Sequence, residues 1–268
     1  MNQPRYREYP IPALLTPFVK LIWSLESDRS IRNAPRERIF PDGCVELVFH
    51  FCDRFCTYFA NGDSRIQPQS FVVGQMNRFI EIQPRGEIGF VAVRFHAHGA
   101  YRFLPGSLKA IAGEVVDTAE IWKRSSTELT DRISMAATMA SRIAIVEEML
   151  LTVLADHRHE DVLVDRALRL IERDASELKI ADLASAIGTS TRELGRRFEN
   201  AVGVSPKKFL RVTRFVRALH RLRDCRQETL TYAAVASGYY DQAHFNHEFR
   251  EFAGITPGEL LTRPHVAF

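Results

Sequence analysis

The sequence lacks several features that would assign it to common classes of protein. No apolar run approaches the roughly 20 residues that a membrane-spanning helix needs, and the opening residues MNQPRYREYP lack the apolar core of a secretory signal. No nucleophile elbow, phosphate-binding loop or paired-carboxylate pattern points to an enzyme. We therefore expect a cytoplasmic protein that has no cofactor, is not an enzyme and does not contact a membrane.

Cysteine is scarce, with four residues in 268, which is poor evidence for disulfides in a cytosolic chain. Two pairs have a spacing that a metal site uses, namely Cys52 with Cys56 and His96 with His98. Cys44 and Cys52, however, lie in apolar segments, where cysteine behaves as a small core residue. We favour the core interpretation and expect no metal, and a redox or metal role of Cys44, Cys52 and Cys56 stays open.

The bulk composition is that of a globular chain with one large domain or two ordinary ones, since 46% of its 268 residues are hydrophobic and 26% are charged. Short β-rich segments, each bounded by Gly, Pro, Asn or Asp, recur about every ten residues in the first third. They cover residues 44–51, 55–60, 70–75, 79–84 and 89–95. This spacing predicts a small barrel or sandwich.

Aromatic residues in the first half of the chain have two interpretations. They either line a ligand cavity or belong to the core, and the core is favoured because strand-facing aromatic residues usually pack. The residues in question are Trp23, Phe49, Phe51, Tyr58, Phe59 and Trp122.

The pattern becomes helical over residues 100–155, most clearly in 130–154. The single apolar face of that segment fits a dimerisation element and a cover for the barrel equally well. A polar stretch at 157–162 marks the boundary that we favour. We predict an α+β chain, with a β-rich, barrel-like domain ending in helices at 1–157 and an all-α domain at 161–264.

The C-terminal part contains an internal repeat. The segment LASAIGTSTRELGRRFENAVGVSPKKF (183–209) aligns with AVASGYYDQAHFNHEFREFAGITPGEL (234–260), at an offset of 50 before the turn and 51 after it. A repeat whose single length difference falls in a turn is far more specific than an isolated motif. The matched pairs include Phe198 with Phe249, Gly203 with Gly254, and Pro206 with Pro257.

Each copy has the pattern of a helix-turn-helix unit. In the first, Gly188 suits the left-handed end of one helix, and Ser190 with Glu193 forms a capping box for the next, which Gly203 ends. In the second, Asp241 caps the corresponding helix. The second helix of such a unit reads base edges in the major groove from its N-terminal residues. We therefore expect DNA contacts at the start of each.

A linker helix predicted over 206–222 joins the two units. Residues 190–226 contain eleven Lys or Arg against three Asp or Glu, whereas residues 227–268 contain two against five. A local excess of positive charge is what phosphate neutralisation needs. We expect the first unit and the linker to supply most of the electrostatic affinity, with the two recognition helices on one face of DNA, about 34 Å apart.

These motifs resemble the AraC/XylS family of bacterial transcription regulators over about residues 165–263. The resemblance rests chiefly on IADLA at 180–184 and on the run GYYDQAHF at 238–245. It implies binding to double-stranded DNA, and Gly195 departs from the long polar residue that the family often has at that position. The base contacts that it implies are Arg192, Gly195, Arg196, Gln242, Ala243, His244 and His247. The backbone contacts that we expect beside them are Ser190, Thr191, Lys207, Lys208, Arg214 and Asn246.

The N-terminal 155 residues are more loosely similar to an uncharacterised sensor-type domain that precedes such DNA-binding halves. The similarity is carried by PDGCVEL at 41–47 and GFVAVRF at 89–95, and it implies a cupin-like barrel. We therefore predict a sequence-specific transcription regulator, activator or repressor, that responds to an unknown small-molecule effector. RNA polymerase and a second copy of the chain are further candidate partners.

Two alternatives to this function stay open. One is a cysteine-based repair or thiol-modifying enzyme fused to the DNA-binding half, with Cys44, Cys52 or Cys56 as its nucleophile. The other is a constitutive DNA-binding dimer without a ligand. For His244 and His247, packing or capping competes with DNA contact, since position in a helix is weak evidence.

Overall fold

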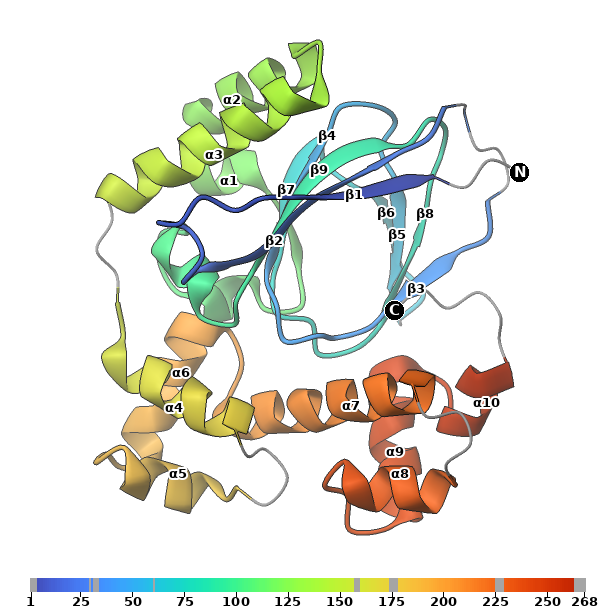
Figure 1. The fold of residues 1–268 in the computed structure, drawn as a ribbon, viewed down its shortest axis with the longest axis vertical. Coiled ribbons are helices and arrows are strands. Elements are labelled where there is room, and N and C mark those ends of the chain that lie inside the picture. Colours follow the sequence, from blue (N-terminus) through green and yellow to red (C-terminus); the bar gives the residue numbers. More distant parts are fainter. Residues whose placement is uncertain are drawn as a thin grey trace.

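The computed structural model describes residues 4–28, 30, 34–59, 61–156, 160–173, 178–224 and 229–262. Two antiparallel sheets face each other, a helical hairpin lies outside the larger sheet, and a layer of helices lies beneath both sheets (Figure 1). The expected domain limits at residues 157 and 264, together with Cys225, fall outside the described residues. The division of the chain at that boundary stays a prediction.

The larger sheet has the strand order β1-β2-β9-β4-β7-β10 and the smaller one β3-β8-β5-β6. The predicted β-rich segments contain β4, β5, β7, β8 and β9, and the barrel-like N-terminal part is confirmed. The strands are β1 Arg5–Tyr9, β2 Val19–Glu26, β3 Glu37–Ile39, β4 Glu46–His50, β5 Cys56–Phe59, β6 Ser64–Ile66, β7 Ser70–Val73, β8 Ile80–Gln83, β9 Gly89–Phe95 and β10 Val115–Asp117.

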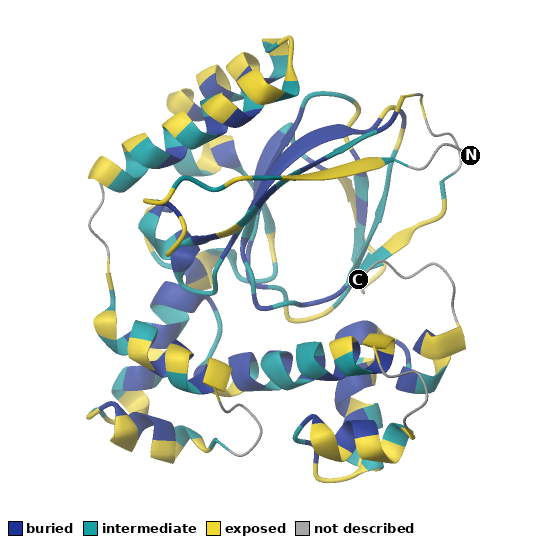
Figure 2. Ribbon diagram, in the orientation of Figure 1, coloured by how far each residue is buried: buried dark blue, intermediate teal, exposed yellow. Residues whose placement is uncertain are grey.

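The central strands of the larger sheet are buried on both faces (Figure 2). Successive side chains of a strand point to opposite faces, so Leu47 and Phe49 of β4 pack toward the helices while Val48 packs between the sheets. Phe90 and Ala92 of β9 join Val48 in that inner layer. An apolar run without polar alternation is therefore what the middle of this sheet requires.

The helical prediction is wrong at the start of its range. Short 3-10 turns, η1 Gly99–Arg102 and η2 Leu108–Ile111, are followed by the edge strand β10. In β10, Val115 pairs with Val73 and Val116 with Val72, and β-branched residues suit a sheet edge better than a helix. The physical reason is that the free edge of β7 offers backbone hydrogen bonds to residues 115–117, and this pairing outweighs their weak helical periodicity.

Three helices then complete the N-terminal part: α1 Thr118–Trp122, α2 Arg124–Met135 and α3 Met139–Asp156. Ile133 of α2 and Val146 and Leu150 of α3 are buried in the same core as Leu47 and Phe49. The segment predicted at 130–154 therefore covers the sheet, whereas its role in dimerisation stays a prediction.

The C-terminal helices form two small cores joined by one long helix, as predicted. Phe198 and Leu194 lie in the first core, and Phe215, Phe245 and Phe249 lie in the second. The long helix α7 spans both units (Figure 1). The helices are α4 Val162–Arg173, α5 Ile180–Ala186, α6 Thr191–Val202, α7 Pro206–Asp224, α8 Leu230–Ala236, α9 Gln242–Ala253 and α10 Pro257–Thr262.

The sheets contact both units at equivalent places, the glycines that end α6 and α9. Gly203 has φ +98° and Gly254 has φ +70°, in the left-handed region that favours glycine. A Cβ on Gly203 would lie 3.1 Å from the carbonyl oxygen of Leu108, and one on Gly254 would lie 2.2 Å from the Phe79 ring. Each glycine thus ends a helix, and its lack of a side chain also lets residues of the N-terminal part lie against that helix end.

A matched pair of alanine substitutions separates these two roles. Gly188, with φ +76°, has no neighbouring atom within 4 Å of a Cβ, so Gly188→Ala should lower the free energy of unfolding by about 1 kcal/mol through backbone strain alone. Gly254→Ala adds a collision with Phe79 and should cost at least about twice as much. Denaturant unfolding monitored by circular dichroism measures both, and equal losses would show that the Phe79 contact contributes nothing.

Candidate nucleic-acid interface

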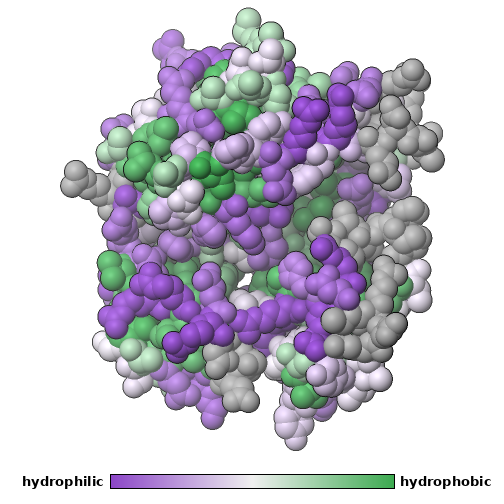
Figure 3. Space-filling model, viewed as in Figure 1, coloured by the Kyte–Doolittle hydropathy of each residue, from purple (hydrophilic) through white to green (hydrophobic). Residues whose placement is uncertain are grey.

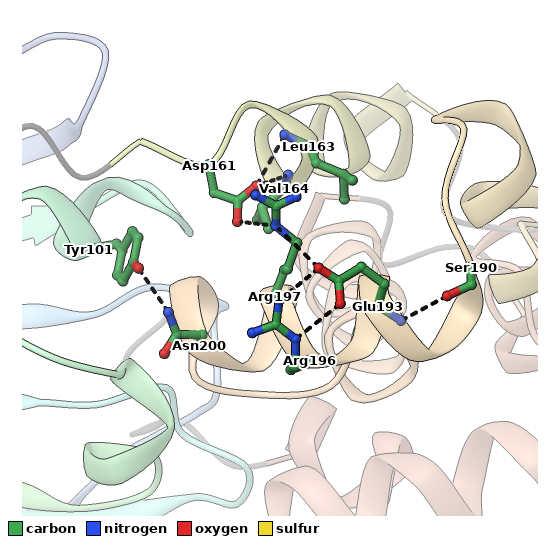
Figure 4. A network of polar contacts seen from close by, with 9 residues as sticks. All are labelled: Tyr101, Asp161, Leu163, Val164, Ser190, Glu193, Arg196, Arg197 and Asn200. Atoms are coloured by element: carbon green, nitrogen blue, oxygen red, sulfur yellow. Dashed lines mark hydrogen bonds and ion pairs between the residues drawn. The ribbon is translucent and has the colours of Figure 1, made fainter.

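The first recognition helix, α6, begins with the cap that the sequence predicts. The Ser190 hydroxyl accepts a hydrogen bond from the backbone N–H of Glu193 at 3.2 Å (Figure 4). The Glu193 carboxylate accepts from the Arg196 guanidinium, at 3.0 and 2.7 Å. Of the two hydrogen bonds of a capping box, the structure therefore has the one that the Ser190 hydroxyl accepts. The Glu193 carboxylate bonds Arg196, one turn further along the helix, and not the backbone of Ser190.

This pairing orients Arg196 at the protein surface. Hydrogen bonds from Arg196 lower the pKa of Glu193, so the carboxylate stays ionised. Arg196 is 70% exposed, and two of its nitrogens, Nε and Nη2, bond Glu193 while Nη1 faces away from that contact. Thr191 and Arg192 are also exposed in the first turn. The start of α6 thus presents two arginines to solvent.

Gly195 lies between these arginines, half exposed, in the middle of a helix. A Cβ at this position would meet no atom within 4 Å. Glycine in a helix interior is about 0.5–1 kcal/mol less favourable than alanine. Packing among the described residues therefore gives no reason for glycine at this position, and the surface of α6 is free for close approach there.

The opposite end of α6 is held by the N-terminal part. The Asn200 side-chain amide donates to the Tyr101 hydroxyl at 2.8 Å (Figure 4). Lys109 contacts Glu199 at 2.7 Å. Arg197 points to α4, where Asp161 accepts from its Nε at 2.8 Å. The helix is consequently fixed at its C-terminal end and open at its N-terminal end.

The second recognition helix, α9, has the same arrangement. Its cap, Asp241, accepts from the backbone N–H of His244 at 2.7 Å, as predicted. At its C-terminal end, the Phe252 carbonyl accepts from the Phe79 backbone N–H at 2.9 Å, and the Ala253 carbonyl accepts from Arg38 at 3.0 Å. Both recognition helices are therefore docked by their ends and present their starts outward.

The predicted base-contact residues of α9 differ in exposure. Ala243 and His247 are exposed, whereas His244 is half buried against the Tyr239 ring, with its Nε2 3.5 Å from Glu248. Gln242 is oriented by the Thr231 hydroxyl, which donates to its side-chain oxygen at 2.7 Å. Asn246 is half buried. The α9 surface presents neutral polar groups where α6 presents arginines.

The basic residues of α7 differ in their contacts. Lys207 is exposed, and hydrophilic residues cover much of α7 on the face drawn in Figure 3. Arg217 donates to the Glu172 carbonyl of α4 at 2.7 Å. A third set turns toward two acidic residues of α9: Lys208 contacts Glu251 at 2.7 Å, and Arg214 lies 3.8 Å from Glu248.

Arg211 completes this cluster by bonding both glutamates, with its Nε 2.5 Å from Glu248. Burial alone would raise the pKa of Glu251, but hydrogen bonds from Arg211 and Lys208 outweigh it and lower the pKa to about 2. Counting charged residues along the sequence does not show that the cations of α7 are paired with the acidic residues of α9. The only sequence signal of this cluster is the one-turn spacing of Glu248 and Glu251 on the face that carries Phe245, Phe249 and Phe252.

The described residues form neither a membrane-spanning helix nor a cluster of metal ligands. None of the helices they form is both long and apolar enough to cross a membrane. Within the same ranges, no three His, Cys, Asp or Glu side chains gather as metal ligands would.

Comparison with known proteins gives a match for each half of the chain. Residues 183–263 match a family described as a helix-turn-helix domain. Residues 7–117 match a family described as a domain of unknown function, DUF6597.

Curated relatives and solved structures are similar over different lengths. The transcriptional activator RhaS of Escherichia fergusonii is 32% identical over 78 residues, 29% of this chain and 28% of that protein. A Streptomyces antibioticus protein described as an AraC-like transcription regulator is 30% identical over 153 residues, 51% of this chain and 49% of that one. The chain thus spans between about a quarter and a half of these relatives.

ToxT from Vibrio cholerae is similar in structure, with a TM-score of 0.50 and 11% identity, over 89% of this chain and 98% of ToxT. This likeness concerns the fold, in which a sheet domain precedes two helix-turn-helix units. The C-terminal repeat thus matches a helix-turn-helix domain family and is similar to AraC-like transcription regulators, and the N-terminal sheets match a family described as a domain of unknown function.

Proposed function

We propose that the protein is a transcription regulator that binds two adjacent major-groove segments of double-stranded DNA in a sequence-specific way. The observation that carries this proposal is the docking of α6 and α9 by their C-terminal ends. A recognition helix reads bases from its N-terminal residues, and those ends are the open ones. In a bacterium such a protein acts in the cytoplasm, where the chromosome is.

The two helices have different tasks in this proposal. Arg192 and Arg196 read bases or phosphates from α6 with positive charge, while Gln242 and His247 read bases from α9 through an amide and an imidazole. Ser190, Thr191, Lys207 and Asn246 supply backbone contacts. Lys208 and Arg214 reach DNA only through a change in their contacts with α9. Contact with RNA polymerase and self-association stay predictions.

The cysteine-enzyme alternative is disfavoured at Cys44 and Cys52 by the surroundings of these two thiols. Burial raises the pKa of Cys44 well above its usual range and the pKa of Cys52 to about 11. The thiolate is the nucleophile, so both groups stay in the unreactive form near neutral pH. Cys56 is then the remaining candidate nucleophile of that alternative, and we propose a regulator without catalytic activity.

We further propose that the N-terminal part responds to an effector and transmits the response through residues 75–80, which lie between the cavity and the C-terminal helices. There, residues that line a cavity between the sheets alternate with residues that touch the helices. Met76 and Ile80 line the cavity, whereas Gln75 contacts Gly203 and Phe79 contacts Gly254. A ligand that displaces the first pair displaces the second, which alters the relative placement of the two recognition helices. This coupling distinguishes the protein from a constitutive dimer.

Arg196→Ala tests the DNA proposal. On an operator selected from random DNA with the full chain, the variant should bind about ten- to a hundredfold more weakly, because a bidentate contact to guanine is lost. Arg124→Ala, at a position on α2 that is 94% exposed and lies at the far side of the larger sheet, is the matched control. Gel-shift titration measures both variants, and equal affinities would refute the placement of Arg196 at a base.

Gly195→Ala should change stability and binding in opposite directions. The free energy of unfolding should rise by about 0.5–1 kcal/mol, because alanine favours the helix and meets no neighbouring atom. Operator affinity should fall about tenfold, because the methyl group occupies the space that DNA approaches. Denaturant unfolding and gel-shift titration measure the two effects, and unchanged affinity would mean that α6 does not approach DNA at this position.

Phe79→Ala tests the coupling. Without its ring the N-terminal part loses its main contact with the end of α9, so an operator with both half-sites should bind about tenfold more weakly. A fragment that carries only the half-site of the first unit should bind as the wild type does. Equal losses on both DNAs would contradict the role given to Phe79.

A further inference from the structure

A cavity of about 120 Å³ lies between the two sheets. Along β4 it is lined by Glu46, Val48 and His50, and along β9 by Phe90 and Arg94. Across the sheet Glu46 is paired with Arg94, and His50 with Phe90. Four residues of extended strand separate Glu46 from His50, which puts them about 13 Å apart. Polar groups therefore lie at two ends of the cavity with an apolar middle between them.

The His50 end offers one hydrogen-bond acceptor. Gln67 donates from its Nε2 to the Thr57 hydroxyl at 3.0 Å, which turns its Oε1 toward His50 Nε2, 2.9 Å away. The imidazole must then donate from Nε2, and its Nδ1 carries the lone pair. Burial lowers the pKa of His50 to about 4, so the ring is neutral near pH 7.

Among the described residues, His50 Nδ1 has no hydrogen-bond partner, although the residue is only 1% exposed. A buried acceptor without a partner is costly, and a native structure usually gives it one. A ligand N–H or O–H group would satisfy it.

The other end of the cavity carries charged groups of both signs. The Arg94 Nε lies 3.2 Å from Glu46 and 3.6 Å from Asp42, and the Lys20 ammonium donates to the Sγ of Cys44, another lining residue, at 3.8 Å. Burial raises the pKa of the Glu46 carboxyl. The Trp23 indole N–H also donates to Glu46, at 2.8 Å. Carboxyl oxygens accept hydrogen bonds, so hydrogen-bond donors on a ligand suit this end as they suit the other.

The cavity has the size and lining for a single aromatic ring. Phe55, Phe71 and Phe90 line its His50 end, with ring centroids 5.5, 5.7 and 5.7 Å from the imidazole. Such rings favour tilted or edge-on contacts with another ring. An apolar cavity of about 150 Å³ in another protein holds benzene, so a volume near 120 Å³ admits one ring and little more.

We infer that this cavity binds a small aromatic molecule that carries hydrogen-bond donors, of the class of simple phenols and aromatic amines. A donor on the ring bonds His50 Nδ1, and the ring packs among Phe55, Phe71 and Phe90. The inference rests on the effector response proposed above, and it names the chemistry of that effector.

Four ring compounds of similar size test the inference on the full chain. Phenol and aniline should bind and raise the melting temperature, whereas toluene and ionised benzoate, which both lack a donor, should bind about tenfold more weakly. Isothermal titration calorimetry gives the four affinities. Benzoate binding as tightly as phenol, or no binding of phenol and aniline, would overturn the inference.

His50→Phe keeps an aromatic ring but removes the acceptor. In this variant phenol should lose its advantage over toluene, while toluene still binds. Should the variant fail to fold, the nitrogen resonances of His50 in the wild type answer the same question, because phenol must shift Nδ1 and toluene must not. An unmoved Nδ1 signal on phenol binding refutes the contact. Operator affinity without any ligand is measured separately, so a failure of DNA binding is distinguished from a failure of this site.

Discussion

The contact of one short segment with two parts of the molecule is the constraint on which the arrangement of this protein depends. The segment from Gln75 to Ile80 bends at Asn77 and Arg78 before β8 begins. Met76 and Ile80 line the cavity between the sheets, and Gln75 and Phe79 lie against the ends of α6 and α9. One short stretch of chain therefore forms part of a cavity wall and part of a domain contact, and close packing carries a displacement of one surface to the other.

The two helix-turn-helix units use one architecture with different electrostatics. In the first unit, Arg196 and Arg197 extend outward or toward α4, and each is oriented by a carboxylate. In the second, Glu248 and Glu251 draw the cations of α7 inward, and Arg211 bridges them. The internal repeat preserves caps, turns and core positions, while charge has diverged. The fold of a unit is set by its buried residues, so its exposed surface is free to differ.

Much of the C-terminal half is predictable from sequence because local signals agree there. The left-handed glycines, the caps at Ser190 and Asp241, and apolar residues at helical spacing each indicate the same boundaries. The edge strand β10 was missed because pairing with β7 is a non-local interaction that no short window contains. For His244 the sequence leaves packing and DNA contact both open, and the structure shows its ring against Tyr239. Trp23 both packs against the inner core and lines the cavity, since an inward-facing aromatic residue has the same pattern in either case.

The pairing of the linker cations has a consequence for how the protein responds to ionic strength. Each phosphate neutralised by a lysine or arginine releases bound counterions, and the salt dependence of binding grows with the number of such contacts. The count of eleven basic residues over 190–226 suggests a steep dependence, but Lys208 and Arg211 are already neutralised by Glu251 and Glu248. Fewer counterions are then released, so occupancy of an operator varies less when the salt content of the cell changes.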